Sequence, residues 1–144
     1  ADLNTAREFG AGCGTNTAAL AFGGGLAPNL PAGSASNELW NGSSWTEVGD
    51  LNNNSAYHSG GGVSTAAISM GRYSPSPSLW PNTEAWNGSS WTEVADLSLG
   101  RYFTGGGGTQ GASLIKASPT YVLLGTTNVT SSEEFSTVST IAVD

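Results

Sequence analysis

The sequence contains a single cysteine, Cys13, and a single histidine, His58. One cysteine cannot form a disulfide within the chain, and neither residue has the partners that a nitrogen- and sulfur-ligated metal site requires. We expect Cys13, which stands in a Gly-Cys-Gly run, to be a small buried side chain. We expect His58 to face solvent or to form a hydrogen bond. No cofactor and no specific metal site is predicted, and the number of carboxylates leaves calcium binding open.

Basic residues are also scarce. Four lysines and arginines stand against 11 acidic residues, which gives a net charge of −7. This balance opposes any sequence-independent binding to phosphate backbones or anionic lipid surfaces, so nucleic acid is not an expected partner. No apolar run approaches the ~20 residues that cross a bilayer, and no membrane insertion is predicted. Because the first residue is not methionine, we expect a processed chain or a piece of a longer array.

Only 10% of the residues are charged, whereas 21 of the 144 are glycine. Helices need strong helix formers, and this composition instead favours a tight, turn-rich all-β architecture. We expect one domain over residues 1–144 with almost no helix.

Internal repetition is the strongest signal in the sequence. The string Trp-Asn-Gly-Ser-Ser-Trp-Thr-Glu-Val occurs at Trp40–Val48 and again 46 residues later at Trp86–Val94. An Asp-Leu pair follows each copy and also opens the chain. The sequence therefore divides into three units, at about 1–48, 49–94 and 95–144. Equivalent positions of units one and two share apolar or glycine character: Phe9 with Tyr57, Gly12 with Gly60, Gly14 with Gly62, Leu20 with Ile68, and Phe22 with Met70.

Four strands are predicted in each unit, which in unit one fall at about 7–14, 17–22, 36–40 and 45–48. The third and fourth strands are joined through Asn41-Gly42, a pair that readily takes the positive φ values of tight hairpin turns. The glycine-rich stretches at 10–14 and 105–108 indicate innermost strands, where neighbouring backbones approach closely.

Unit three departs from this pattern. Leu114 stays in register with Leu20, and an insertion then precedes Tyr121-Val122-Leu123-Leu124-Gly125, which we interpret as the apolar strand that ends in glycine. A last strand pair is predicted at Glu133–Phe135 and Ile141–Val143. The loss of the tryptophan string there is typical of a terminal capping repeat.

The combination of Leu20-Ala21-Phe22-Gly23-Gly24 with Trp40 and Trp45 resembles the Kelch repeat, in which an apolar strand ends in a glycine doublet and aromatic residues follow. The resemblance implies three four-stranded blades of a β-propeller. The residues of the repeat are also similar to those of Kelch-like arrays in phage and environmental viral structural proteins. This similarity implies a virion or extracellular location. Because propellers close with four to eight blades, we expect two copies to complete a six-bladed ring.

Repeated residues outside the glycine positions have structural interpretations. The four repeat tryptophans are expected to pack between neighbouring blades. Arg7 and Arg101 share a repeat position and are expected to pair with an acid or a carbonyl near a strand start. The repeated acids are expected on solvated blade faces: Glu38, Glu47, Glu84, Glu93 and Glu133.

Trp80 lies outside the repeated string, in a stretch rich in serine and proline between Tyr73 and Pro81. Binding residues are frequent on such loops, so Trp80 is a candidate ligand contact. An acidic sugar is one ligand that the arginines could grip. The candidate ligand-binding residues are Trp80, Tyr73, His58, Arg7, Arg101 and Tyr102.

No catalytic constellation appears in the sequence. The glycine runs lack the lysine of a phosphate-binding loop, no nucleophile elbow is present, and a repeat places its acids on different blades rather than across one cleft. We therefore expect no enzyme, and a polysaccharide hydrolase is disfavoured. The first hypothesis is a recognition or adhesion module for glycan or a host-surface protein. The second is a structural building block that binds copies of itself, in a virion or an extracellular fibre.

Overall fold

The computed structural model describes residues 1–25, 33–73, 80–100, 102, 105–115, 119–122, 125–128 and 133–136. Across these residues the chain consists of antiparallel strands, turns and irregular segments, with no helix, so the expected all-β class is confirmed. Within the same residues, no helix long and apolar enough to cross a membrane is found.

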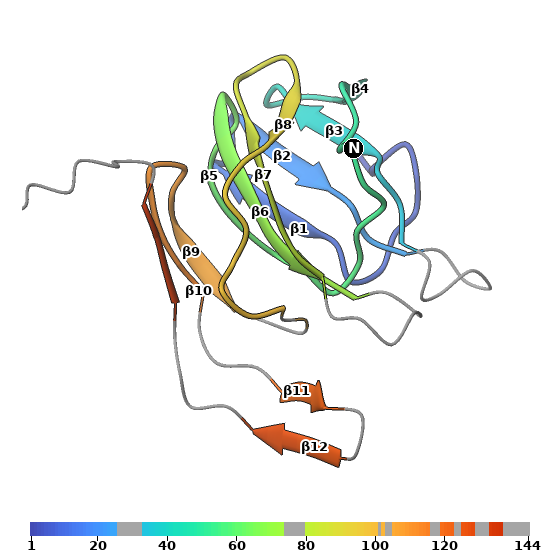
Figure 1. Ribbon diagram of the computed structural model, residues 1–144. Coiled ribbons are helices and arrows are strands. Elements are labelled where there is room, and N and C mark those ends of the chain that lie inside the picture. The colour runs from blue at the N-terminus through green and yellow to red at the C-terminus, as the bar shows by residue number, and fades with distance from the viewer. Residues whose placement is uncertain are drawn as a thin grey trace, which may run out of the picture.

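Unit one forms a four-stranded antiparallel sheet in sequence order (Figure 1). Its strands are β1 (Ala11–Gly14), β2 (Ala19–Phe22), β3 (Asn37–Trp40) and β4 (Trp45–Val48). All four predicted strands of this unit are confirmed, although the first begins later than expected because residues 7–10 form a connecting segment.

Unit two repeats the arrangement with β5 (Ser59–Val63), β6 (Ala66–Arg72), β7 (Trp80–Trp86) and β8 (Trp91–Glu93). The pairing of Trp86 with Trp91 in unit two reproduces that of Trp40 with Trp45 in unit one. The repeated string therefore forms the same hairpin twice.

Unit three is built differently. Strands β9 (Gly106–Thr109), β10 (Ala112–Ile115) and β13 (Glu133–Ser136) form one sheet, and β11 (Pro119–Val122) with β12 (Gly125–Asn128) forms a separate hairpin. The interpretation of Tyr121–Gly125 as the second strand of the unit is wrong. β10 occupies that position, since Leu114 pairs with Gly107 as Leu20 pairs with Cys13. The last strand predicted at Ile141–Val143 lies outside the described residues.

A glycine stands at or one residue before the end of the first strand of every unit. Gly14, Gly62 and Gly108 have φ values of +112°, +106° and +122°, and a Cβ at each would lie within 2.4 Å of a carbonyl oxygen across the turn. Only glycine avoids both the strain and the clash at this turn.

The Asn-Gly hairpin is confirmed as a four-residue turn over 41–44. Gly42 has a φ of +95°, and the Asn41 side-chain oxygen accepts hydrogen bonds from the amides of Ser43 (2.9 Å) and Ser44 (3.0 Å). An Asn side chain that mimics a backbone turn in this way accounts for the choice of residue.

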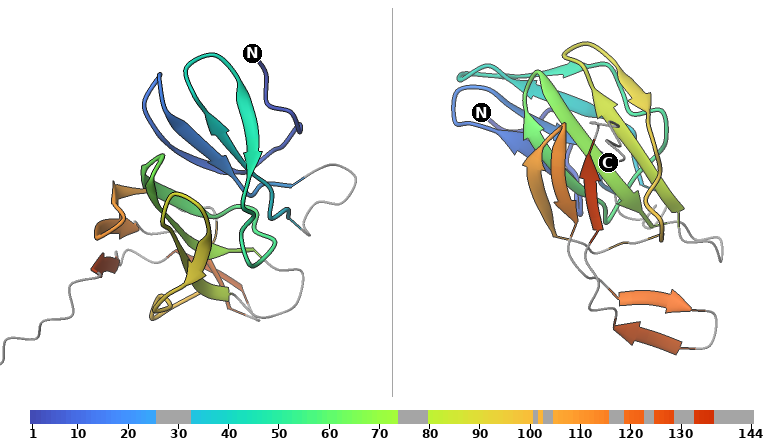
Figure 2. Two further views of the ribbon diagram at one scale, coloured as in Figure 1. Left: turned by 90° about the horizontal axis from the view of Figure 1, so that it is seen from above. Right: turned by 60° about the vertical axis from the view of Figure 1, so that its left-hand side comes forward.

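The sheets of successive units stack face to face (Figure 2). We call the side of each sheet that carries the tryptophan pair its tryptophan face, and the other side its opposite face. Leu20 and Phe22 on the opposite face of unit one pack against Trp86 and Trp91 on the tryptophan face of unit two, and the Phe22 and Trp91 ring centroids are 4.9 Å apart. The predicted packing of tryptophans between units is confirmed for this pair.

A second, smaller core continues the stack towards unit three. Ile68 and Met70, on the opposite face of unit two, are fully buried with Leu97. The Ser113 hydroxyl of β10 lies 3.6 Å from the Met70 sulfur. The same face-to-face relationship therefore joins units one and two and units two and three.

The first strands of the three sheets lie side by side, β1 next to β5 and β5 next to β9. A Cβ on Gly60 would lie 2.6 Å from the Phe22 ring and 2.9 Å from the Ala11 Cβ, and a Cβ on Gly61 would lie 3.2 Å from the Gly108 carbonyl oxygen. The close approach predicted for the stretches at 10–14 and 105–108 is thus observed where each of them meets β5, at Ala11 and at Gly108.

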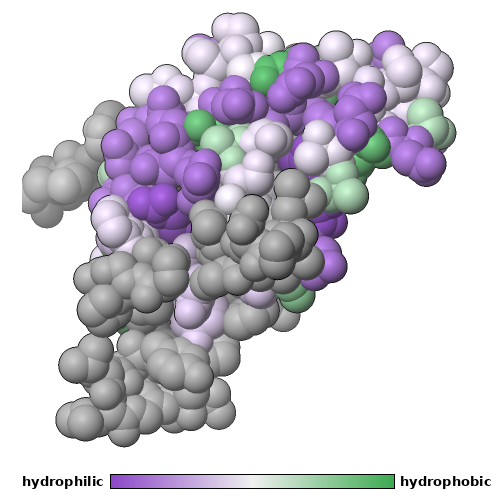
Figure 3. Space-filling model, turned by 90° about the vertical axis from the view of Figure 1, so that its right-hand side faces the viewer, coloured by the Kyte–Doolittle hydropathy of each residue, from purple (hydrophilic) through white to green (hydrophobic). Residues whose placement is uncertain are grey.

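Apolar side chains are largely enclosed by this stacking. On the side of the molecule shown in Figure 3, hydrophilic residues cover much of the described surface and hydrophobic residues appear as small separate patches. Among the described residues, the large hydrophobic side chains that remain exposed are Phe9, Val63, Trp80 and Leu99.

Candidate functional site

The two ends of the stacked sheets differ in their connections. At one end, which we call the turn end, short turns at 15–18, 64–65 and 110–111 join the first and second strands, and the hairpin turns lie there too. At the other, the loop end, longer connections at 23–36, 73–79 and 116–132 join the second strand to the third, and β11–β12 belongs to the last of these. Loops on a rigid scaffold are the usual place for binding residues.

A row of aromatic rings crosses all three units at the loop end, and we call it the aromatic ladder. Phe9 stacks on Tyr57 with ring centroids 4.3 Å apart, Tyr57 meets the edge of Tyr73 at 5.7 Å, and Tyr73 meets Tyr102 at 5.3 Å. Such pairs stabilise by about 0.5–1.5 kcal/mol each beyond area burial. The ladder therefore ties the units together and presents an aromatic surface.

Exposure decreases along the ladder. Phe9 is 47% exposed, Tyr57 and Tyr73 are half-buried, and Tyr102 is 2% exposed. The accessible part is the Phe9 end. Phe9 and Tyr57 both have a φ of +58°, a left-handed conformation that is uncommon for bulky residues. Strain of this kind persists only where the surrounding structure enforces it, and it is frequent at functional sites.

Trp80 and Arg72 form a second feature of the loop end. They pair across β6 and β7, and the Arg72 guanidinium carbon lies 4.4 Å from the centre of the Trp80 ring. Arg72 also donates a hydrogen bond to the Asn54 carbonyl (2.9 Å). Burial lowers the pKa of Arg72, and the charges of Glu84 and Glu93 partly offset this. The Trp80 ring thus packs against a cation, and because it is 37% exposed it also remains accessible to solvent.

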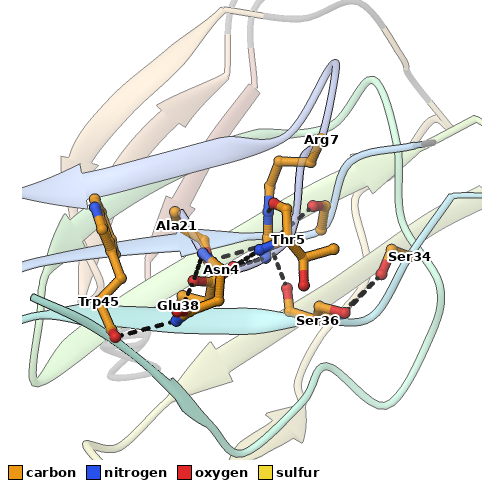
Figure 4. A network of polar contacts seen from close by, with 9 residues as sticks. Asn4, Thr5, Arg7, Ala21, Ser34, Ser36, Glu38 and Trp45 are labelled. Atoms are coloured by element: carbon orange, nitrogen blue, oxygen red, sulfur yellow. Dashed lines mark hydrogen bonds and ion pairs between the residues drawn. The ribbon is translucent and has the colours of Figure 1, made fainter. Parts of the chain in front are cut away.

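Arg7 belongs to a network of polar contacts within unit one (Figure 4). Its side chain is 6% exposed, forms an ion pair of 2.5 Å with Glu38, and donates to the carbonyls of Ala21 (3.3 Å), Gly23 (3.2 Å) and Ser36 (2.8 Å). The expected pairing of Arg7 with an acid and with carbonyls is confirmed. Because these contacts engage the guanidinium and burial leaves 6% of the side chain exposed, Arg7 is not accessible to a sugar. Arg101 lies outside the described residues.

The expectation that Glu38 and Glu84 are solvated is wrong, because they are 1% and 3% exposed. Glu38 accepts hydrogen bonds from the Asn4 amide (2.8 Å) and from Thr5 (3.2 Å), and Glu84 accepts them from Asn52 (2.7 Å) and Asn53 (3.1 Å). In units one and two, the segment that enters the unit folds over the carboxylate of that unit.

Burial alone would raise the pKa of Glu38, but the amide hydrogen bonds of Asn4 and Thr5 and the charge of Arg7 together lower it. Glu47 and Glu93 are exposed, as predicted. Glu133 pairs with Ile115 in the backbone register, which is the position that Glu38 holds opposite Ala21.

His58 is expected either to face solvent or to form a hydrogen bond, and the first alternative is wrong, since the residue is 6% exposed. Its ring fills the space above Gly23, where a Cβ would lie 2.3 Å from the ring. Among the described residues neither ring nitrogen has a hydrogen-bond partner of good geometry. Burial lowers the pKa of His58 to about 4, and the backbone of Phe22 opposes the shift only in part. His58 is therefore neutral at physiological pH, and its ring packs against Gly23.

Cys13 is another titratable side chain whose pKa is strongly shifted by burial. Burial raises the pKa of the half-buried Cys13 thiol to about 11, with the Leu20 backbone opposing, so the thiolate is scarce at neutral pH. Within the ranges that the structure describes, no three His, Cys, Asp or Glu side chains are grouped as a metal site.

Of the six candidate ligand residues, the structure brings Tyr73, Tyr102 and Trp80 to the loop end, and it buries Arg7 and His58. Sequence reasoning missed Phe9, Tyr57 and Arg72 as site residues. The signal was available for the two aromatics, because they occupy one repeat position just before a glycine-rich strand.

Comparisons with known proteins give information on the fold alone. No family model matches the chain, and no curated protein matches it. A solved structure described as "Structure of YjhT" is similar, with a TM-score of 0.70 and 15% sequence identity over 88% of this chain and 42% of that chain. The chain thus spans less than half the length of that structure. At this identity the similarity concerns the arrangement of the strands.

Proposed function

We propose that the chain is a non-enzymatic recognition module that binds glycan through the loop end of its stacked sheets. The observation that carries this proposal is the position of the aromatic ladder and the Trp80–Arg72 pair at that end of the stacked sheets. The module belongs to a virion appendage or another extracellular structure, as the Kelch-like wording of the repeat implies.

Sugar recognition fits the chemistry of these residues. The apolar face of a pyranose ring stacks on flat aromatic rings, and Trp and Tyr combine such a surface with a polar group. Phe9 (47% exposed) and Trp80 (37% exposed) supply accessible rings from units one and two. The cation of Arg72 holds the Trp80 ring at 4.4 Å, so a ligand meets a surface that is already ordered.

The proposed architecture is a sector of a β-propeller. Support comes from two four-stranded sheets in simple sequence order, from the side-by-side glycine-rich first strands, and from the repeated contact of a tryptophan face with an opposite face. In a propeller the loop ends of successive sheets lie on one surface, where several units can contact one ligand.

The distribution of carboxylates supports binding without catalysis. Glycoside hydrolysis uses two carboxylates across one site, about 5–10 Å apart. Glu38 and Glu84 are buried and hydrogen-bonded within their own units, and Glu47 and Glu93 belong to separate sheets. Glu38 and Glu84 therefore hold the entry segments of their units, and Glu47 and Glu93 face solvent.

A glycan array followed by calorimetric titration of the best saccharide tests the proposal. Trp80→Ala and Phe9→Ala should each weaken binding about tenfold or more, since stacked rings contribute about 1.4 kcal/mol or more at a binding site. Val63→Ala is the matched control, because Val63 is 49% exposed but ends β5 at the turn end. Absence of binding to any saccharide, or equal losses in all three variants, would contradict the proposal.

A further inference from the structure

The same tryptophan pair has two different environments in units one and two. Trp86 and Trp91 are 1% and 5% exposed, whereas their repeat equivalents Trp40 and Trp45 are only half-buried. The pairs have the same internal geometry, with ring centroids 5.5 Å and 5.4 Å apart. The difference therefore arises from what lies over each pair.

In unit two the tryptophan face is covered by unit one. Leu20 and Phe22 pack on Trp86 and Trp91, and Leu39 and Val48 border the cluster. Gly49 adds a close backbone approach, since a Cβ there would lie 3.5 Å from the Trp86 ring. The opposite face of one unit is thus shaped to fit the tryptophan face of the next.

The tryptophan face of unit one has the same construction. The Trp40 indole donates to the Asn16 carbonyl (2.8 Å), as the Trp86 indole donates to the Ser64 carbonyl (3.0 Å). Ala19 pairs with Trp40 as Ala67 pairs with Trp86, yet Ala67 is fully buried and Ala19 is not. In the described part of the chain, no sheet covers this face.

Both units also cover the lower part of this face with their own entry segment. Asn4 contacts Glu38 and the Trp45 carbonyl, and Asn52 contacts Glu84 and the Trp91 carbonyl. In unit two, the entry segment does not prevent unit one from stacking on the tryptophan face. The equivalent segment of unit one therefore leaves room for a sheet to pack on the tryptophan face of unit one.

We propose that the tryptophan face of unit one, formed by Ala19, Trp40 and Trp45, is a docking surface for a second copy of this chain. The partner surface is the side of the β9–β10–β13 sheet that points away from unit two. The internal contact between units one and two is the template for this interface, and a second copy carries the same repeat. Two copies supply six principal sheets, within the range of about four to eight in closed propellers.

Native mass spectrometry and light scattering of the intact 144-residue chain test this proposal. At about 10 micromolar protein we expect twice the 14.5 kDa mass of the chain. Trp45→Glu and Ala19→Arg each place a charge at the interface and should weaken association by about 100-fold or more. Val63→Glu is the control, because it places the same charge on an exposed residue at the turn end and should leave the mass unchanged.

The two interface variants guard against a failure to fold. Circular dichroism identifies a variant that has lost its strands, and the other variant then decides the result. A folded wild-type monomer at that concentration overturns the proposal, as does a dimer that persists in both folded variants. Larger assemblies that Trp45→Glu dissolves support the docking face and overturn closure by two copies.

Discussion

Arg7 and Glu38 form an ion pair of 2.5 Å whose two side chains are 6% and 2% exposed. The pair joins the segment that enters unit one to the middle of its sheet. It is also the only part of the carboxylate network that the described residues of unit two do not repeat, because Ser55 stands in place of the arginine. The contribution of a buried carboxylate to the free energy of unfolding can therefore be measured twice in one protein, with and without a cation in direct contact.

Glu38→Gln should lower the free energy of unfolding by about 3–5 kcal/mol, because it leaves the buried Arg7 charge without its partner. Glu84→Gln should cost less, about 1.5–3 kcal/mol, since it weakens hydrogen bonds to a charged group and the longer-range attraction of Arg72 but breaks no direct ion pair. Urea unfolding measures both. Glu47→Gln, on the same strand pair but exposed, should change stability by less than about 0.5 kcal/mol, and a Glu38→Gln cost no larger than this would show that the pair is not stabilising.

Stability should fall as the pH is lowered from 6.5 to about 4. His58 has a pKa of about 4 in the folded protein and an ordinary pKa near 6.5 when unfolded, so the unfolded state binds more protons in this window. The slope is about 1.4 kcal/mol per pH unit. Urea unfolding at several pH values should show this slope in the wild type and lose it in His58→Phe.

Carboxylates act in a different pH range. Because the pKa of Glu38 is lowered in the folded protein, its contribution is present at neutral pH and is lost only as the pH falls through that lowered pKa. A slope between pH 6.5 and 5 that persists in His58→Phe would therefore contradict the assignment to the one histidine in the chain.

Gly23→Ala should destabilise the protein by more than Gly42→Ala. Both positions have positive φ values, but only at Gly23 would the new methyl group meet a ring, 2.3 Å from His58. The strain of the left-handed conformation costs about 1–2 kcal/mol at either position. In a His58→Gly background, which restores the residue of Gly10 in unit one, the excess cost should shrink by about 1 kcal/mol, and additivity in this double-mutant cycle would exclude the contact.

Repeat-equivalent tryptophans should respond differently to the same change. Trp91→Ala removes a ring that is 5% exposed and should cost about 3–5 kcal/mol. Trp45→Ala should cost about half of that or less in the separated chain, because its ring is only half-buried. Thermal unfolding of both variants in dilute solution measures the difference, and equal costs would mean that unit one does not cover Trp91 in solution.

The sheets of units one and two could be predicted because their signals are local. The tryptophan string fixes a hairpin, and Asn41-Gly42 supplies its turn. The second strand of unit three was wrongly predicted because Tyr121–Gly125, like Leu20–Gly24 of unit one, has apolar residues followed by glycine. What distinguishes it is the pairing of β10 with β13, a contact between residues far apart in the chain.

The site was less predictable than the fold, for a related reason. Strand periodicity places Glu38 beside Trp40 on one face, but it cannot show that Asn4 folds over that carboxylate. Likewise, nothing local distinguishes a histidine on the surface from one packed on Gly23. The aromatic ladder joins rings of three units, so only the stacking of the sheets brings it together.

Hydroxyl-radical footprinting of the intact chain, with and without a bound saccharide, tests the location of the recognition surface most directly. The account predicts protection of Phe9 and Trp80 at the loop end, with Val63 at the turn end oxidised equally in both states. Protection at Val63 with Phe9 and Trp80 unchanged would contradict it.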